Sequence, residues 1–304
     1  MKPTATMDGG SPASEVWIQP TGAALAADVH GVDLSLPLDP EAVDAIGQAW
    51  TEHLVLRLSA QRLSDADLVR FSQMFGELDV HPQYRPSPGE LPYARWVISI
   101  SNIVVEGRKL GSLGYGEAAW HADMTYNPAP PRASLLYAIE CPPEGGSTWF
   151  ANMYAAFEDL PTEVKAQIST LSCVHDASRD SSGRLRSGYA PVDDPRATPG
   201  ARHPLVSVHP VTGRPCLFLG RRAGAYVVGL TLSDSEALLD RLWAHATQDR
   251  FVWKQHWRVG DLVMWDNRCV LHRRDAFDNR QRRLMHRTQI VGEPMLGLER
   301  PARS

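Results

Sequence analysis

The strongest chemical signal in the sequence is a histidine and an aspartate separated by one residue, in Trp120-His121-Ala122-Asp123. Residues two apart in an extended segment point to the same side, so one imidazole and one carboxylate can reach the same metal ion. A His-X-Asp tripeptide is also common around ordinary hydrogen-bonded histidines. Whether His121 and Asp123 form a metal site therefore depends on which other residues of the chain could complete it.

A third ligand has to come from a distant part of the chain, and His272, at the end of Trp265-Asp266-Asn267-Arg268-Cys269-Val270-Leu271-His272, is the candidate. Two histidines and one carboxylate on one face of an octahedral ion form the facial triad of non-haem Fe(II) oxygenases. Three positions of the ion then stay open for a bidentate organic ligand and O₂. The pattern predicts an iron site at His121, Asp123 and His272.

Two further residues suit the far carboxylate of 2-oxoglutarate, whose keto-acid end would chelate such an iron. A buried carboxylate requires a cation and a hydrogen-bond donor. Arg283 lies 11 residues after His272 (283 − 272), and a short turn between them would place it on the next strand, beside the metal. Thr148, in Gly145-Gly146-Ser147-Thr148-Trp149, could supply the hydroxyl. Taken singly, each residue could equally have a structural role: Arg283 as a solvated arginine on a strand, and Thr148 as a residue that favours β-structure.

With these pieces the sequence resembles the TauD/TfdA family of Fe(II)- and 2-oxoglutarate-dependent dioxygenases, which includes taurine dioxygenase and the aryloxyalkanoate dioxygenases. The resemblance runs in family order from about residue 22 to 293. It rests on these segments: Trp120–Tyr126, Pro143–Thr148, His203–Val206, His209–Arg214, Gly260-Asp261, Trp265–Arg268, His272 and Arg282–Arg287.

The resemblance implies a role for each site residue. His121, Asp123 and His272 would bind Fe(II), and Thr148 and Arg283 would hold the 2-oxoglutarate C5 carboxylate. Arg287 would grip an acidic group of the substrate. The remaining substrate-pocket residues would be His81, Tyr84, Glu117 and Met124.

Two departures from taurine dioxygenase affect the expected substrate. Glu117 stands where that enzyme has a polar amide, and the segment 86–118 carries aromatic and apolar residues such as Tyr93 and Trp96. Taurine itself is therefore not the expected substrate. We predict hydroxylation of a small aryloxyalkanoate- or sulfonate-like acid, with succinate and CO₂ as co-products. Where the attacked carbon bears an ether oxygen or a sulfonate, the C–O or C–S bond would break.

Three alternatives stay open at this point. The first is a hydroxylase of an amino-acid or natural-product scaffold, in which Arg287 only supports the fold. The second is a jelly-roll protein that binds small acids without turnover. A zinc hydrolase that uses the same three ligands is the third. The paired Thr148 and Arg283 anchor favours the dioxygenase, because neither of the last two needs it.

Composition limits the partners and the compartment. The 304 residues carry a formal net charge of −4, which disfavours nucleic acid or an anionic membrane as partner. The four cysteines are scattered, as in a cytoplasmic protein without disulfides. By the resemblance we expect a homo-oligomer, a dimer or tetramer. Residues 1–14 read as a disordered tail and residues 15–304 as a single domain.

The elements that must position these residues are mostly short strands with turn signals between them, which predicts a mainly β fold with helices (α+β): a double-stranded β-helix, or jelly roll, decorated by helices. Asp39-Pro40 and Ser64 with Asp67 are typical of two helix starts. Ser233 with Glu236 predicts a third helix that runs to about Ala246. The segments 80–118 and 176–202 are long and weakly periodic, as functional loops often are.

Overall fold

The computed structural model describes residues 16–80, 84, 86, 89, 91–113, 118–180 and 183–298, with the backbone alone at 112 and 113. The expected tail, residues 1–14, lies outside this part. The main feature of the fold is a pair of mostly antiparallel sheets packed face to face. The larger sheet runs in the order β1 (Trp17–Pro20), β2 (Ala27–His30), β3 (Val55–Leu58), β17 (Leu262–Asp266), β9 (Ala133–Glu140), β19 (Leu284–Ile290), β4 (Ile98–Ser101) and β7 (Ser112–Leu113).

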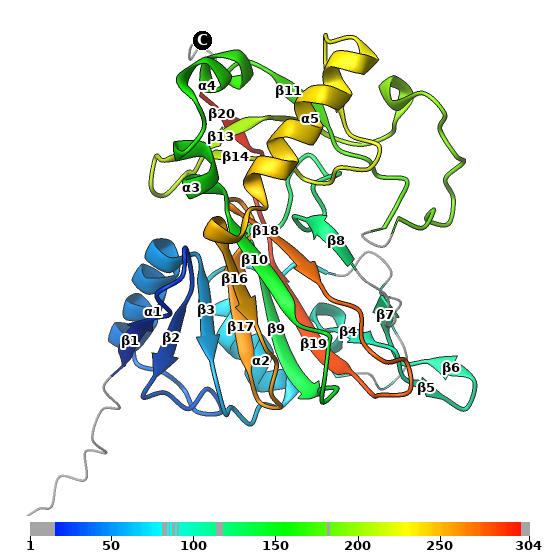
Figure 1. Cartoon of the computed structure of the whole chain (residues 1–304). Helices are drawn as coiled ribbons and strands as arrows, with labels where there is room; N and C mark the ends of the chain where they lie inside the picture. Colours follow the sequence, from blue (N-terminus) through cyan, green and yellow to red (C-terminus); the bar gives the residue numbers. More distant parts are fainter. Residues whose placement is uncertain are drawn as a thin grey trace, which may run out of the picture.

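The smaller sheet faces the central strands of the larger one (Figure 1). Its order is β16 (Val252–Gln255), β10 (Thr148–Asn152), β18 (Val270–Arg274) and β8 (Ala118–His121). Phe150 of β10 lies 5.4 Å from Trp265 of β17, measured between ring centroids, so side chains of the two sheets meet in one core. This confirms the jelly roll.

Strands β9 and β17 are buried on both faces. Leu136, Ala138 and Trp265 pack into the core between the sheets, whereas Leu135 and Met264 pack into a second core under helices α1 and α2. Alternation along each strand produces this division, because successive side chains point to opposite faces. With both faces covered, such strands read as continuous apolar runs.

The two helices that cover the outer face begin where the sequence predicted. In α1 (Pro40–His53), Asp39 accepts a hydrogen bond from the Ala42 amide at 2.7 Å. In α2 (Asp65–Gln73), Ser64 and Asp67 form a reciprocal capping box. Each side chain satisfies an amide that the first helical turn leaves without a partner.

The remaining helices and short sheets gather at one end of the molecule, at the top of Figure 1. They are α3 (Met153–Glu158), α4 (Thr162–Ile168) and α5 (Leu232–Ala246); the sheet β12 (Arg202–Pro204), β11 (Ser172–Val174) and β15 (Tyr226–Val227); and the sheet β14 (Pro215–Leu217), β13 (Val206–Val208) and β20 (Leu296–Gly297). At the other end lies the hairpin of β5 (Val104–Val105) and β6 (Arg108–Lys109).

One predicted helix start was wrong. Helix α5 is capped by Thr231, whose hydroxyl accepts from the Asp234 amide at 3.1 Å, and not by Ser233. Both residues are followed three positions later by an acid, so the local pattern fits either start. The chain leaves a turn at Gly229 and is extended at Thr231, which sets the first helical turn two residues earlier.

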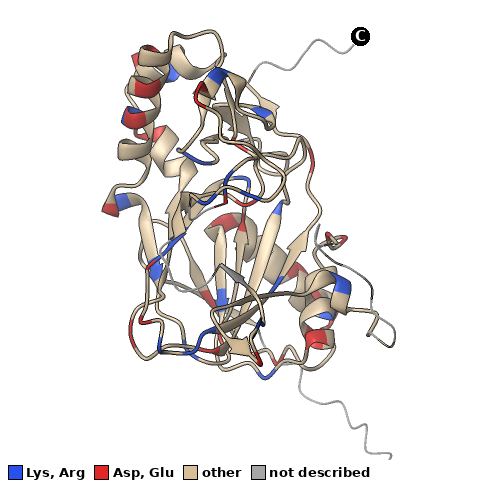
Figure 2. Cartoon of the chain, turned by 90° about the vertical axis from the view of Figure 1, so that its right-hand side faces the viewer, with Lys and Arg blue, Asp and Glu red and all other residues tan. Residues whose placement is uncertain are grey.

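Lys and Arg are interspersed with Asp and Glu along the described ribbon (Figure 2). No helix within the described ranges is long and apolar enough to cross a membrane. All four cysteines are free thiols, as the scattered spacing predicted.

Candidate functional site

Strand pairing in the smaller sheet brings His121 and His272 together. β8 and β18 are antiparallel with His272 opposite His121, and their ring centroids lie 4.1 Å apart. Asp123 follows β8 in a turn, with its Oδ1 3.7 Å from His121 Nε2 and 3.9 Å from His272 Nε2. All three residues are buried, and one donor atom of each lies within 4.8 Å of the others. A single cation can contact all three.

The protonation of these groups suits a cation. His121 Nδ1 lies 2.7 Å from the Ala119 carbonyl oxygen and donates to it, which leaves the lone pair on Nε2. Burial lowers the pKa of His121 well below its usual range and that of His272 to about 4, so both rings are neutral at neutral pH. Burial alone would raise the pKa of Asp123, but Arg287 and the two imidazoles bring it well below the ordinary value. The result is two neutral nitrogens and one carboxylate.

Asp123 is held by residues that sequence reasoning did not select. Asn267, in the turn after β17, accepts from the Asp123 amide at 2.6 Å and donates to the Asp123 carbonyl at 2.9 Å. Its amide nitrogen also donates to the Pro131 carbonyl at 2.8 Å. Ser134 donates to the Asp123 carboxylate at 2.8 Å. Both the backbone and the side chain of Asp123 are therefore fixed.

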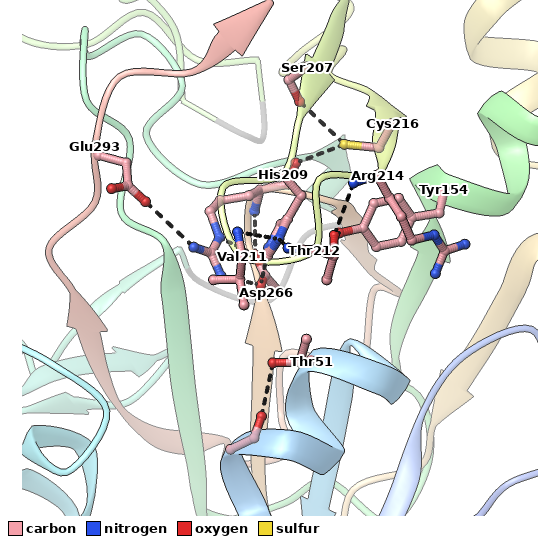
Figure 3. A network of polar contacts seen from close by, with 12 residues as sticks. Thr51, Tyr154, Ser207, His209, Val211, Thr212, Arg214, Cys216, Asp266 and Glu293 are labelled. Carbon is pink, nitrogen blue, oxygen red and sulfur yellow. Dashed lines mark hydrogen bonds and ion pairs between the residues drawn. The ribbon is translucent and has the colours of Figure 1, made fainter. Parts of the chain in front are cut away.

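The turn that carries Asn267 is itself held by a buried polar network (Figure 3). His209 Nδ1 accepts from the amides of Val211 and Thr212, so its proton lies on Nε2, which donates to Asp266 at 3.0 Å. Arg268 forms a two-pronged ion pair with the same carboxylate, at 2.9 and 2.6 Å. His209, Asp266 and Cys269 are close enough to hold a metal. However, the guanidinium already neutralises Asp266, so we read this group as structural.

A cavity with about 480 Å³ of space, part of it open to solvent, lies next to the two histidines between the sheets. Its walls combine apolar and basic side chains: Ile100, Ala118, His121, Leu136, Thr148, Trp265, His272, Arg274, Arg283 and Arg287. The predicted anchor pair, Thr148 and Arg283, thus lines the same cavity as His121 and His272, two of the three predicted iron ligands.

The Thr148 hydroxyl accepts from the Trp257 indole N–H at 2.9 Å, so its own proton is available to a ligand. Arg283 is buried, and its Nε has no hydrogen-bond partner. Burial and the neighbouring Arg274 lower the pKa of Arg283 to about 9, which still leaves it charged at neutral pH. A buried cation without an acid beside it is costly unless a ligand supplies the anion.

Arg287, the predicted substrate clamp, points at the metal ligands. Its Nη1 donates to the two carboxylate oxygens of Asp123 at 3.3 and 3.4 Å, and its Nε is buried without a partner. It comes from β19, the strand that follows Arg283. Both arginines lie on the cavity wall.

Of the other four predicted substrate residues, the structure describes only Tyr84 and Met124. His81 and Glu117 lie outside the described residues. Tyr84 is half-buried, and Met124 is buried in the turn after Asp123 with a left-handed φ of 48°. Neither Tyr84 nor Met124 is among the described residues that line the cavity. Their roles stay predictions.

Residues 17–289 match the family model described as taurine catabolism dioxygenase TauD, TfdA family. The chain is 34% identical over 293 residues to the (S)-phenoxypropionate/alpha-ketoglutarate-dioxygenase of Delftia acidovorans, which covers 91% of this chain and 95% of that protein.

Two solved structures share the fold. A taurine dioxygenase from Burkholderia xenovorans superposes with a TM-score of 0.75 at 31% identity, covering 94% of both chains. AAD-2, crystallised with Mn(II) and N-oxalylglycine, has a TM-score of 0.75 at 30% identity and covers 93% of this chain and 100% of that one. These matches confirm the predicted resemblance and the enzyme class, and they remove the hydrolase and the non-catalytic binder from consideration. The chain therefore belongs to the TauD/TfdA family of dioxygenases, which are oxidoreductases.

Proposed function

We propose that this enzyme hydroxylates a small acidic organic molecule in a reaction that consumes 2-oxoglutarate and O₂ and requires Fe(II). The observation that carries the proposal is the single cavity that unites the two histidines with Thr148 and Arg283. The cofactor set predicted from the sequence is that of the relatives, which are alpha-ketoglutarate-dependent dioxygenases.

The residues present fit Fe(II). His121, Asp123 and His272 would hold it, since they supply the two imidazoles and one carboxylate of a facial triad. The fixed Nδ1–H of His121 and the clamped backbone of Asp123 support this assignment, because outer hydrogen bonds orient metal ligands. When bound, iron would couple the oxidative decarboxylation of 2-oxoglutarate to hydroxylation of a C–H bond.

The basic end of the cavity suits the C5 carboxylate of 2-oxoglutarate. Arg283 would provide the charge, and the Thr148 hydroxyl, oriented by Trp257, would donate a hydrogen bond. N-oxalylglycine, which AAD-2 binds together with Mn(II), carries the same two acid groups as 2-oxoglutarate.

The protein's part in the reaction is positioning and exclusion of water. Arg287 would hold the acid group of the substrate beside the metal ligands, and the apolar walls made by Ile100, Leu136 and Trp265 would keep the reacting carbon dry. The Delftia relative is named for phenoxypropionate, which favours an aryloxyalkanoate over a sulfonate. Attack on the carbon next to the ether oxygen would give an unstable product and break the C–O bond.

Succinate formation tests the proposal. Purified enzyme with Fe(II), ascorbate, O₂ and 2-oxoglutarate would be offered aryloxyalkanoates, sulfonates, alkyl sulfates and amino acids. We expect succinate to rise well above the substrate-free background with at least one acid. Iron-loaded enzyme that releases no succinate with any compound would contradict the proposal. Turnover of neutral amides as fast as of their acids would contradict the acidic substrate.

Three broader expectations are part of the proposal. The free thiols support a reducing cytoplasm as the site of action. The shared core between the two sheets supports one catalytic domain over residues 15–304. A dimer or tetramer is expected from the family, and light scattering at several protein concentrations would test it.

A further inference from the structure

Arg186 and Arg221 form a second pair of arginines near the proposed iron ligands. Neither has a role in the dioxygenase reaction proposed above. Arg221 follows β14 and forms an isolated antiparallel bridge with His121, so its backbone runs beside that ligand. Arg221 is therefore close to the proposed metal centre, although it comes from a different part of the chain from Arg283 and Arg287.

The guanidinium of Arg221 is only partly satisfied by hydrogen bonds. Nη1 donates to the Arg179 carbonyl at 2.6 Å, whereas Nε is buried without a hydrogen-bond partner. In the described part of the chain no carboxylate comes within ion-pair distance of it. Asp180, an acid of the neighbouring loop, forms an ion pair with Arg184 at 3.2 Å.

Arg186 adds a second charge to the same place. Its guanidinium carbon lies 4.0 Å from the centroid of the Tyr126 ring, and that of Arg221 lies 5.7 Å from the same ring. Burial and the charge of Arg186 lower the pKa of Arg221, whereas Tyr126, Asp123 and Asp180 act in the opposite direction. Two like charges share one aromatic ring, and neither of them forms an ion pair with a described carboxylate. An anion bound between the two cations would reduce their mutual repulsion.

We propose that Arg186 and Arg221, together with Tyr126, form a second anion subsite for the prime substrate. This inference rests on the proposed function and narrows the substrate class. If Arg287 holds the acid group near the reacting carbon, a second cationic subsite selects a molecule that carries another anionic group. The substrate is then a dianion, with a carboxylate, sulfate or phosphate as its second charge.

Matched pairs of compounds test the subsite. Phenoxyacetate would be compared with 4-carboxyphenoxyacetate, and hexanoate with adipate; further arms replace the second carboxylate by a sulfate or a phosphate ester. We expect the dianion of each pair to bind at least 10-fold more tightly to wild-type protein loaded with Mn(II) and N-oxalylglycine, by calorimetry. Succinate release with Fe(II) gives the corresponding KM values. The arm with the tightest binding identifies the second group.

Variants connect the preference to the two arginines. Arg221→Met and Arg186→Met should each weaken dianion binding by about 10- to 100-fold and leave the monoanion within about 3-fold, as expected when one partner of a charge pair is removed. Arg222→Met is the matched control, because Arg222 is the next residue but forms ion pairs with Glu236 and Asp240. Arg221→Lys should restore part of the binding, which separates loss of charge from misfolding.

The outcomes are distinguishable from those of the proposed function. Equal affinity for monoanion and dianion in the wild-type protein would overturn the subsite, as would equal losses for both compounds in Arg221→Met. Because binding is measured without turnover, the subsite can be tested even if no compound yields succinate. Absence of succinate with every compound would instead reject the dioxygenase reaction proposed above.

Discussion

At the scale of single residues, the most instructive side chain is Asn267, which touches no predicted ligand atom and yet fixes Asp123. Its amide accepts from the Asp123 N–H and donates to the Asp123 carbonyl, a pair of contacts that only a primary amide provides. The Asp123 side chain then extends toward the two histidines from a fixed backbone. Asn267 is thus a positioning residue for the proposed metal site.

We predict that Asn267→Asp lowers metal affinity by about 10- to 100-fold, the usual cost of losing an outer partner of a metal ligand. The aspartate cannot donate to the Asp123 carbonyl, and its charge repels that oxygen. Mn(II) titration measures the affinity, and thermal unfolding of the metal-free protein measures the fold. A lower melting temperature with unchanged Mn(II) affinity would show that Asn267 serves the fold alone.

Arg283 illustrates a residue whose function opposes stability. It is 2% exposed and carries its charge without an acid nearby in the described structure. We predict that Arg283→Met leaves the metal-free protein as stable or more stable, by up to a few kcal/mol. The same change should raise the KM for 2-oxoglutarate by about 100-fold or more. Urea unfolding and succinate release measure the two effects, and a large loss of stability would contradict the ligand-anchor role.

Arg287 is proposed to bind the acid group of the substrate and not 2-oxoglutarate, so replacing it should have a different effect. Arg287→Ala should raise the KM for an acidic substrate by on the order of 100-fold and that for its amide by much less, because only the acid needs the cation. The KM for 2-oxoglutarate is the internal control. Equal effects on acid and amide would assign Arg287 to the structure of β19.

At the scale of elements, helix α5 offers a clean test of how its first turn is fixed. Thr231→Ala removes a hydroxyl that caps the Asp234 amide and should destabilise the protein by about 1 kcal/mol. Ser233→Ala, two residues on, is the matched control and should change stability by less than about 0.5 kcal/mol. Urea unfolding curves compare the two. The reverse order would mean that the helix begins at Ser233 in solution.

The same elements show what sequence patterns can and cannot determine. Asp39-Pro40 and Ser64 with Asp67 predicted two helix starts, because each combines a cap with an apolar face at helical spacing. Thr231 and Ser233 could not be distinguished, since the choice depends on the turn at Gly229. Likewise, the spacing of His272 and Arg283 predicted neighbouring strands, whereas β19 in fact pairs with β9 and β4 in the opposite sheet. Arg283 reaches the cavity from across the sandwich.

At the scale of the whole molecule, the site is assembled by long-range pairing that no local pattern encodes. Asn267 and Arg221 meet the ligand segment only because turns of β17 and β14 converge on it. In the sequence, Asn267 lay within the recognised Trp265–Arg268 motif, but nothing there said that its partner is the backbone of Asp123. Arg221 had no motif at all. Its unpaired charge becomes visible only when its surroundings are known.

This assembly predicts a stepwise stabilisation by ligands, because the two histidines and the anchor residues lie on both sheets. Binding to the folded state alone adds about 2.7 kcal/mol at a ligand concentration 100 times Kd, which corresponds to several degrees in Tm for a domain of this size. Mn(II) should therefore raise Tm, and N-oxalylglycine should raise it further only when Mn(II) is present. EDTA should reverse both increments in Tm.

Two variants separate these increments. Thr148→Val should retain the Mn(II) increment in Tm and lose most of the N-oxalylglycine increment, whereas His121→Ala should lose both. If N-oxalylglycine stabilised the metal-free protein as strongly as the Mn(II) form, the two ligands would not share one cavity as the geometry requires.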